Sequence, residues 1–314
     1  MNEIKTMLKK HYNIDITKVS PQQGGWSALA YKVSNNKHAY FLKVYETSRA
    51  STPKWTDLID QYGPIMVWLL HHTKLKGKMP VPVLTNTSEY KCEDDRGIYL
   101  LYKYIDGMTI GNRNLTEEQV AQLSEIIAEL HLYREEIPVE TKAIKEDFDV
   151  SFLQQLWNIL YKQQTSIPTE VRKLIKPHIE HIDDLIETVE EQAMRLKNSH
   201  LKMALCHTDL HNWNLMQSKQ QLILIDWEGL TLAPVEADMM FLVDKPYYDS
   251  FLRVYRKVHQ NFVINPDALG FYQGRRKLED IWELIEQLTY DNQDSQGKME
   301  TMHYLTQALK DLTD

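Results

Sequence analysis

Apolar residues follow two different rhythms along this chain, and the change comes near residue 107. Before it, short runs alternate apolar and polar side chains, which is the pattern of half-buried β-strands. Three of these runs are separated only by the turn-forming segments Gly24-Gly25 and Ser34-Asn35-Asn36; they occupy 16–23, 27–35 and 37–45. Short strands joined by tight turns predict an antiparallel meander.

The rest of this N-terminal part supplies two helices and one more strand. Residues 3–12 and 55–72 have the apolar periodicity of helices. The continuous apolar run GIYLLYKYI at 97–105 predicts a buried strand that ends at Asp106-Gly107.

After residue 107 the spacing is mainly helical. A helix is predicted after Thr116, because its hydroxyl can cap the helix and the apolar residues that follow share one face. Further helices are predicted at 151–164, 169–197, 246–262, 276–291 and 298–312. Strand-like runs in this part lie at 203–207, 214–218 and 222–227.

These patterns predict an α+β protein of two lobes, a small sheet-rich part at 1–106 and a helical part at 107–314. Ligand pockets favour the junction between domains, so we expect a site where the two lobes meet.

Composition narrows the class of protein. The chain has 314 residues and a net charge of -8, which argues against a protein that grips nucleic acid. Its only cysteines, Cys92 and Cys206, are too few for a disulfide framework. The N-terminal residues lack a secretory signal and no window is apolar enough to span a membrane. We therefore expect a cytoplasmic monomer with no nucleic-acid or membrane partner.

Polar side chains crowd into LCHTDLHNWNLM, residues 205–216, where a hydrophobic segment is about to begin. His207, Asp209 and His211 are metal-ligand types, but no HExxH or CxxC motif supports a zinc site. No GxSxG motif supports an acyl-transfer enzyme. The polar groups can also cap one another in an ordinary turn.

The spacing favours a fourth interpretation. Asp209 and Asn214 lie on one short loop. Asp226 directly follows the apolar run at 222–225, which is the second strand-like run after that loop begins. Phosphoryl transfer needs a carboxylate beside the acceptor hydroxyl and oxygen ligands for magnesium, and these three residues supply both. Residues suited to a nucleotide lie upstream: a glycine turn at Gly24-Gly25-Trp26-Ser27, and Lys43 among the apolar residues of the third strand.

With these features the chain resembles the aminoglycoside phosphotransferase family, which has a protein-kinase-like bilobal fold. The resemblance covers nearly the whole chain. It rests on the glycine turn and on FLKVY, VPV, YIDG, ELH, HTDLHNWN and IDWEG. The longer run LIDWEGLTLAPVEADMMFL is most similar to the spectinomycin phosphotransferase branch. The resemblance implies that 1–106, which includes the hinge, is the nucleotide-binding lobe, and that 107–314 carries the catalytic loop and the acceptor site.

The resemblance also implies roles for individual residues. Asp209 is expected to be the catalytic base, with His207 bracing its loop. Asn214 and Asp226 are expected to hold Mg²⁺. Lys43, with Gly24, Gly25 and Ser27 of the glycine turn, is expected to contact the phosphates of ATP or GTP. Two further residues are expected to support the loop without taking part in catalysis. Asp238 is expected to anchor the loop from the following helix, and His211, within the loop, is expected to help shape it.

Two departures from the family pattern affect the nucleotide site. The lysine's partner on the first long helix is usually Glu, whereas this helix offers only Asp57 and Asp60, and Asp60 is the favoured partner. Tyr102 is expected at the back of the adenine pocket, with the backbone of Lys103 to Ile105 as the hinge. Because relatives with a bulky aromatic residue there can prefer GTP, we expect reduced selectivity for ATP.

The acceptor is expected to be a small, cationic molecule with a hydroxyl group, of the aminoglycoside or aminocyclitol class. A negatively charged protein attracts such a molecule. Candidate wall residues are Glu228, Glu236, Glu279, Asp280 and Trp282. Two other functions fit the same fold: a metabolic kinase of choline, ethanolamine or a sugar, and a catalytically silent scaffold.

Overall fold

The computed structural model describes residues 2–22, 24 and 27–312, which form two compact units. The first unit comprises most of the chain up to Lys145 together with Met203–Val263. The second comprises Ser48–Ser51, Glu146–Lys202 and the chain from Ile264 onward. The lobe boundary predicted at residues 106 and 107 falls inside the first unit, and it stays a prediction.

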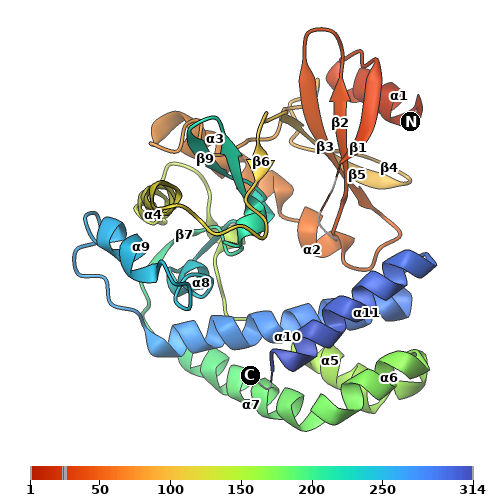
Figure 1. The fold of residues 1–314 in the computed structure, drawn as a ribbon, viewed down its shortest axis with the longest axis vertical. Coiled ribbons are helices and arrows are strands. Elements are labelled where there is room, and N and C mark those ends of the chain that lie inside the picture. The colour runs from red at the N-terminus through yellow and green to blue at the C-terminus, as the bar shows by residue number, and fades with distance from the viewer. Residues whose placement is uncertain (1, 23, 25–26, 313–314) are drawn as a thin grey trace. The chain divides into compact units, whose positions relative to one another are not determined.

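A five-stranded antiparallel sheet, shown with its strands labelled in Figure 1, begins the first unit. Its strands are β1 (Lys18–Gln22), β2 (Leu29–Ser34), β3 (Ala39–Glu46), β4 (Cys92–Asp94) and β5 (Gly97–Lys103). They lie in the order β1-β2-β3-β5-β4. The antiparallel meander and the buried strand near 97–105 are confirmed. Strand β4 is not predicted by the sequence, because its three residues are too few to show an alternation of apolar and polar side chains.

Three helices belong to the same part of the chain: α1 (Asn2–Tyr12), α2 (Thr52–Thr56) and α3 (Ile59–His72). Helix α1 forms a core with the sheet, where Met7 and Leu8 pack in one cluster with Val33, Leu42 and Leu101. The helix predicted at 55–72 is in fact divided, since α2 ends at Thr56 and α3 starts at Ile59.

The remainder of the first unit positions the polar loop. It contains β6 (Met108–Thr109), α4 (Glu117–Leu130), β7 (Met203–Cys206), β8 (Leu215–Ser218), β9 (Gln221–Leu224), β10 (Thr231–Pro234), α8 (Glu236–Met239) and α9 (Tyr248–Tyr255). The predicted cap of α4 is confirmed: the Thr116 side chain accepts a hydrogen bond from the backbone N–H of Gln119. In return, the Gln119 side chain accepts a hydrogen bond from the backbone N–H of Thr116. Strands pair as β6-β8-β9 and as β10-β7.

The second unit is helical. It contains α5 (Phe152–Tyr161), α6 (Thr169–Ile175), α7 (Ile179–Lys197), α10 (Pro266–Tyr290) and α11 (Ser295–Lys310). The helix predicted at 169–197 is interrupted around Pro177, which lacks the N–H that a continuous helix needs. Helix α10 begins ten residues earlier than predicted, because Asn265 caps it and Pro266 suits the first helical position. None of the helices in the described residues is long and apolar enough to span a membrane.

Candidate active site

A short loop followed by a hairpin carries the predicted catalytic residues. Strand β7 ends at Cys206, and the chain runs through a 3-10 turn at Asn212–Asn214 directly into β8. Strand β9 then returns antiparallel to β8, with Leu215 opposite Leu224. The Ile225 N–H donates to the Asn214 carbonyl over 2.9 Å, so the end of the hairpin is fastened to the end of the loop.

The predicted base and the predicted magnesium ligand are bonded to each other within this loop. The Asn214 amide nitrogen donates to the Asp209 carboxylate over 2.7 Å and to its carbonyl over 2.9 Å. Asn214 is buried, whereas the Asp209 side chain is 26% exposed and so open to a small molecule. Because the Asn214 nitrogen is committed to Asp209, its amide oxygen is the group left to bind a cation.

His211 lies on the same carboxylate. Its Nε2 is 3.2 Å from the Asp209 oxygen and 3.4 Å from the Asn214 nitrogen. These contacts agree with a part in shaping the loop, and its role stays a prediction.

His207 holds the start of the loop from inside the protein. It is fully buried, and its Nε2 is 2.9 Å from the Ile225 carbonyl, which only a protonated nitrogen can bond. Its Nδ1 then accepts the Asp209 N–H over 3.3 Å. Burial lowers the pKa of His207, against the pull of the nearby Asp238 and Asp209 carboxylates. A neutral imidazole with both nitrogens bonded is suited to bracing rather than to proton transfer.

We expect His207 to make the fold less stable in mild acid. Its pKa is lowered in the folded state, so the unfolded chain takes up the proton first as the pH falls through about 6.5. The free energy of unfolding should therefore decrease below that pH, by at most about 1.4 kcal/mol per pH unit for this one group. Denaturant titrations of wild type and His207→Gln between pH 5 and pH 8 measure the difference.

His259 also has a lowered pKa, caused by burial, so the comparison between variants matters more than the wild-type slope alone. His181→Gln, at an exposed position of α7, is the control and should leave the slope unchanged. An equal slope in wild type and His207→Gln would contradict the assignment.

Asp238 of α8 anchors the loop, in the position that the sequence resemblance implied. One of its oxygens accepts the Thr208 N–H over 2.6 Å, and the other accepts the His207 N–H over 3.1 Å. Thr208 has a left-handed backbone, with φ of 66°, which is costly for a β-branched residue. The Asp238 carboxylate therefore stabilises a strained turn immediately before Asp209.

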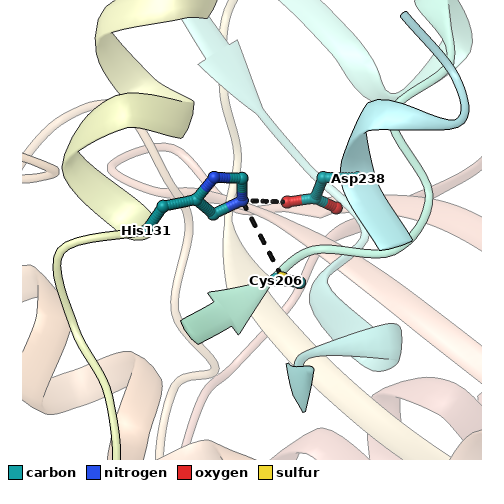
Figure 2. Close-up of side chains that lie close together, drawn as sticks. All are labelled: His131, Cys206 and Asp238. Carbon is teal, nitrogen blue, oxygen red and sulfur yellow. Dashed lines mark hydrogen bonds and ion pairs between the residues drawn. The ribbon is translucent and has the colours of Figure 1, made fainter. Parts of the chain in front are cut away.

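His131, at the end of α4, completes this anchor. Figure 2 shows its ring directed at Asp238, with Cys206 alongside. Its Nε2 is 2.9 Å from the Asp238 carboxylate and 3.8 Å from the Cys206 sulfur, and its Nδ1 is 2.8 Å from the Tyr255 hydroxyl. In the described part of the chain this is the one His, Cys and Asp group compact enough to surround an ion. Because Asp238 already bonds two backbone amides, we interpret the group as a support for the loop.

The predicted phosphate-contacting lysine lies beside the second predicted metal ligand. Lys43 of β3 is 2.5 Å from an Asp226 carboxylate oxygen and 2.7 Å from a Glu228 oxygen. Burial acts to lower the pKa of Lys43, but the two carboxylates outweigh it and raise the pKa well above its ordinary value. Lys43 is thus a fixed positive charge next to Asp226.

The turn at Asp226 has the donor types that suit Mg²⁺. Asp226 has a left-handed backbone, with φ of 65°, and leads into a 3-10 turn at Trp227–Gly229. Its side chain is 36% exposed, so its second oxygen can reach a bound ion. A carboxylate and an amide oxygen, from Asp226 and Asn214, are hard ligands of the kind that magnesium prefers, and the site fits that ion by its chemistry.

The predicted partner of Lys43 on the first long helix is wrong. Asp60 of α3 lies against Lys91, with 3.6 Å between their charged atoms, and the lysine's carboxylates come from the Asp226 turn instead. Glu228 is one of the residues predicted from the sequence to line the acceptor site. Its position two residues after Asp226 was the only signal for its contact with Lys43.

The remaining nucleotide-site candidates occupy the sheet and its edges. Tyr102 of β5 is buried, pairs opposite Phe41 and bridges to Pro82. Lys103 ends the same strand with its side chain exposed, and Ile105 follows two residues later. Their parts in binding a nucleotide stay predictions.

The glycine turn connects β1 to β2. A Cβ at Gly24 would lie 2.8 Å from the Ala28 carbonyl, so the close backbone approach there needs glycine. Ser27 lies in a bend just before β2, and Gly25 lies outside the described residues.

Two of the candidate acceptor walls are paired with arginines on their own helix, α10. Glu279 bonds Arg275 over 2.8 Å, and Asp280 bonds Arg276 over 2.9 Å. Burial raises the pKa of Asp280, against the nearby Arg276.

The fold is similar to several solved kinases. A spectinomycin phosphotransferase in complex with ADP and spectinomycin superposes with a TM-score of 0.75 at 21% identity, over 99% of this chain and 97% of that one. A microcompartment-associated aminopropanol kinase gives 0.63 at 11% identity, over 98% and 95%. A choline kinase from Streptococcus pneumoniae gives 0.61 at 15% identity, over 99% and 98%. These likenesses confirm the predicted α+β, protein-kinase-like fold.

Comparison with curated proteins gives no match. A sequence model of the phosphotransferase enzyme family (APH), in contrast, matches residues 18–272, a span that includes Lys43, Asp209, Asn214 and Asp226. The resemblance found in the sequence is therefore confirmed, and the chain belongs to the phosphotransferase enzyme family.

Proposed function

We propose that this protein is a Mg²⁺-dependent O-phosphotransferase. It transfers the γ-phosphate of a nucleoside triphosphate to a hydroxyl group of a small cationic acceptor. The observation that carries the proposal is the 2.7 Å hydrogen bond from the Asn214 amide nitrogen to the Asp209 carboxylate. It places the carboxylate that serves as the base and the amide that serves as a metal ligand side by side in one loop.

Each group has a part in this reaction. Asp209 accepts a hydrogen bond from the acceptor hydroxyl, orients its oxygen towards the γ-phosphate and takes its proton as the new O–P bond forms. The bond between the γ-phosphorus and the β–γ bridging oxygen breaks in the same step, and the nucleoside diphosphate leaves. Lys43 contacts the α- and β-phosphates. Asn214 and Asp226 would hold magnesium, which supplies charge neutralisation at the phosphate oxygens.

We propose an aminoglycoside or aminocyclitol as the acceptor, and antibiotic resistance as the consequence. The net charge of -8 supports a cationic substrate. The spectinomycin-binding protein has the highest TM-score of the three comparisons. We further propose that the protein acts as a monomer in the cytoplasm, with no nucleic-acid or membrane partner.

A second candidate is a kinase of choline, ethanolamine or another amino alcohol. It is favoured by the similarity of the fold to a choline kinase and to an aminopropanol kinase. Both candidates share the catalytic groups and differ only in the acceptor.

A panel of acceptors tests the proposal and separates the candidates. Spectinomycin, several aminoglycosides, choline, ethanolamine and amino sugars are each incubated with Mg²⁺ and ATP or GTP, and phosphorylated product is measured. One strong acceptor among the aminocyclitols or aminoglycosides supports the first candidate, and one among the amino alcohols supports the second. Absence of Mg²⁺-dependent nucleotide binding would favour a scaffold that has kept the fold.

The same panel tests nucleotide choice. We expect comparable turnover with ATP and GTP in wild type, because the buried ring of Tyr102 is expected to narrow the base pocket. Tyr102→Ala should restore a preference for ATP, seen as a rise in the ratio of kcat/KM values for the two nucleotides. The melting temperature of the variant is measured alongside, since removing a buried ring opens a cavity. Strict use of ATP by wild type would rule out this role for Tyr102.

A further inference from the structure

The carboxylate of Glu228 contacts the Lys43 ammonium group directly and is placed to fix its position. Its Oε1 is 2.7 Å from the Lys43 ammonium and also accepts the Tyr45 hydroxyl over 2.8 Å. The Glu228 side chain is only 5% exposed, and the Lys43 side chain 12%. A buried carboxylate bonded to two donors on β3 has a defined orientation, unlike an exposed ion pair.

The helix that was expected to supply this carboxylate does not do so. Its acidic residue Asp60 is 52% exposed and pairs with Lys91. Neighbouring Tyr62 is buried on α3 but has a hydroxyl without a hydrogen-bond partner. Helix α3 therefore gives Lys43 no charged partner through Asp60.

We propose that Glu228 is the positioning residue of Lys43, with the Tyr45 hydroxyl orienting its carboxylate. This inference rests on the proposed function, because it assigns a part in holding the lysine that contacts the nucleotide phosphates. Glu228 acts through Lys43 and does not itself touch the reacting atoms.

The turn that carries Glu228 is well fixed. Trp227 is almost fully buried, and its indole N–H donates to the Leu224 carbonyl over 2.8 Å. A Cβ at Gly229 would clash with the Thr208 hydroxyl oxygen, so the turn packs closely on the loop that carries Asp209. The same fixed turn therefore carries both Asp226, a predicted magnesium ligand, and Glu228, which positions Lys43.

The charges of Lys43, Asp226 and Glu228 explain why two carboxylates contact one lysine. Lys43 carries a single positive charge, so together with Asp226 and Glu228 it forms a group with net negative charge. A cation held by Asp226 would balance that excess, and Lys43 would keep Glu228 as its own partner. In this arrangement the lysine's position depends on the Asp226 turn and not on the placement of α3.

Glu228→Gln is the variant that tests the assignment, because glutamine keeps the shape and the oxygen but loses the charge. We expect weaker binding of Mg²⁺-nucleotide, measured by calorimetry, and a fall of about a hundredfold in kcat/KM for the nucleotide. The KM for the acceptor should stay near its wild-type value. Tyr45→Phe should shift nucleotide binding in the same direction by a smaller factor. Glu125→Gln removes an exposed carboxylate from α4 and is the matched control.

A double-mutant cycle gives a readout that needs no activity. Unfolding is measured for wild type, Lys43→Met, Glu228→Gln and the double variant. We expect Glu228→Gln to destabilise the protein clearly less in the Lys43→Met background than in wild type.

The outcomes separate this inference from the proposed function. If wild type phosphorylates an acceptor and Glu228→Gln binds nucleotide normally, the inference is wrong and the function stands. Loss of nucleotide binding in Asp60→Asn but not in Glu228→Gln would also overturn it, in favour of the helix carboxylate. Wild type that binds no Mg²⁺-nucleotide would overturn the proposed function, and with it the part given to Glu228.

Discussion

Asp209→Asn is expected to lower the rate of phosphoryl transfer by about 10²–10⁴-fold while leaving nucleotide affinity within about twofold of wild type. The amide cannot take the proton of the acceptor hydroxyl. It can still accept the hydrogen bond from the Asn214 nitrogen, so the loop should keep its shape. The loss should therefore appear in kcat with the best acceptor of the panel, and not in the dissociation constant of the nucleotide.

The control for this prediction is Asp244→Asn, which removes one negative charge at an exposed position of the same unit. It should leave both parameters unchanged, because no general loss of charge is involved. A wild-type rate in Asp209→Asn, with any acceptor that the enzyme uses, would show that another group accepts the proton.

The residues around Asp209 could be found in the sequence because their chemistry is local. Asp209 and Asn214 share one loop, and a single hairpin separates them from Asp226, so spacing alone brought the three together. Lys43 was recognisable as a charge among the apolar residues of a strand. The structure pairs it with Asp226, as a common site requires.

The partner of Lys43 could not be predicted in this way. Glu228 is 185 residues from Lys43 in the chain, and its contact depends on how the Asp226 turn packs against β3. The resemblance to the family pointed to a carboxylate on α3 instead. On that helix the aspartate Asp60, one methylene shorter than the usual glutamate, forms an ion pair with Lys91. A pattern of residue types carries no information about which of two nearby acids is closer in space.

Short elements escaped prediction for a related reason. Strand β6 has only two residues, too few for a periodic pattern, although it pairs with β8 beside the loop. Strand β10 was missed as well, although the strands β7, β8 and β9, which are equally short, were predicted. The early start of α10 was signalled by Asn265-Pro266, a cap that was not recognised among the surrounding loop residues. By contrast, the long helix α4 and its cap at Thr116 followed directly from periodicity and capping chemistry.

Asp238→Ala is expected to cause the largest loss of stability, about 3–5 kcal/mol. The substitution removes the acceptor of three donors: the amides of His207 and Thr208 and the ring of His131, of which only the Thr208 amide is part-buried rather than buried. Both side chains of the His131–Asp238 pair are fully buried, so water cannot replace the lost carboxylate without disturbing the packing. Denaturant unfolding monitored by circular dichroism measures the change.

Ser124→Ala is a suitable comparison, because Ser124 is also buried in the first unit but donates only one neutral hydrogen bond, to the Phe251 carbonyl. Its loss should cost about 1 kcal/mol. Hydrogen exchange gives a local readout: the amides of His207 and Thr208 should exchange much faster in Asp238→Ala than in Ser124→Ala. Equal costs for the two variants, with unchanged exchange at these amides, would mean that the strained turn before Asp209 is held by its other contacts, such as the bond from the Thr208 hydroxyl to the Gly229 carbonyl.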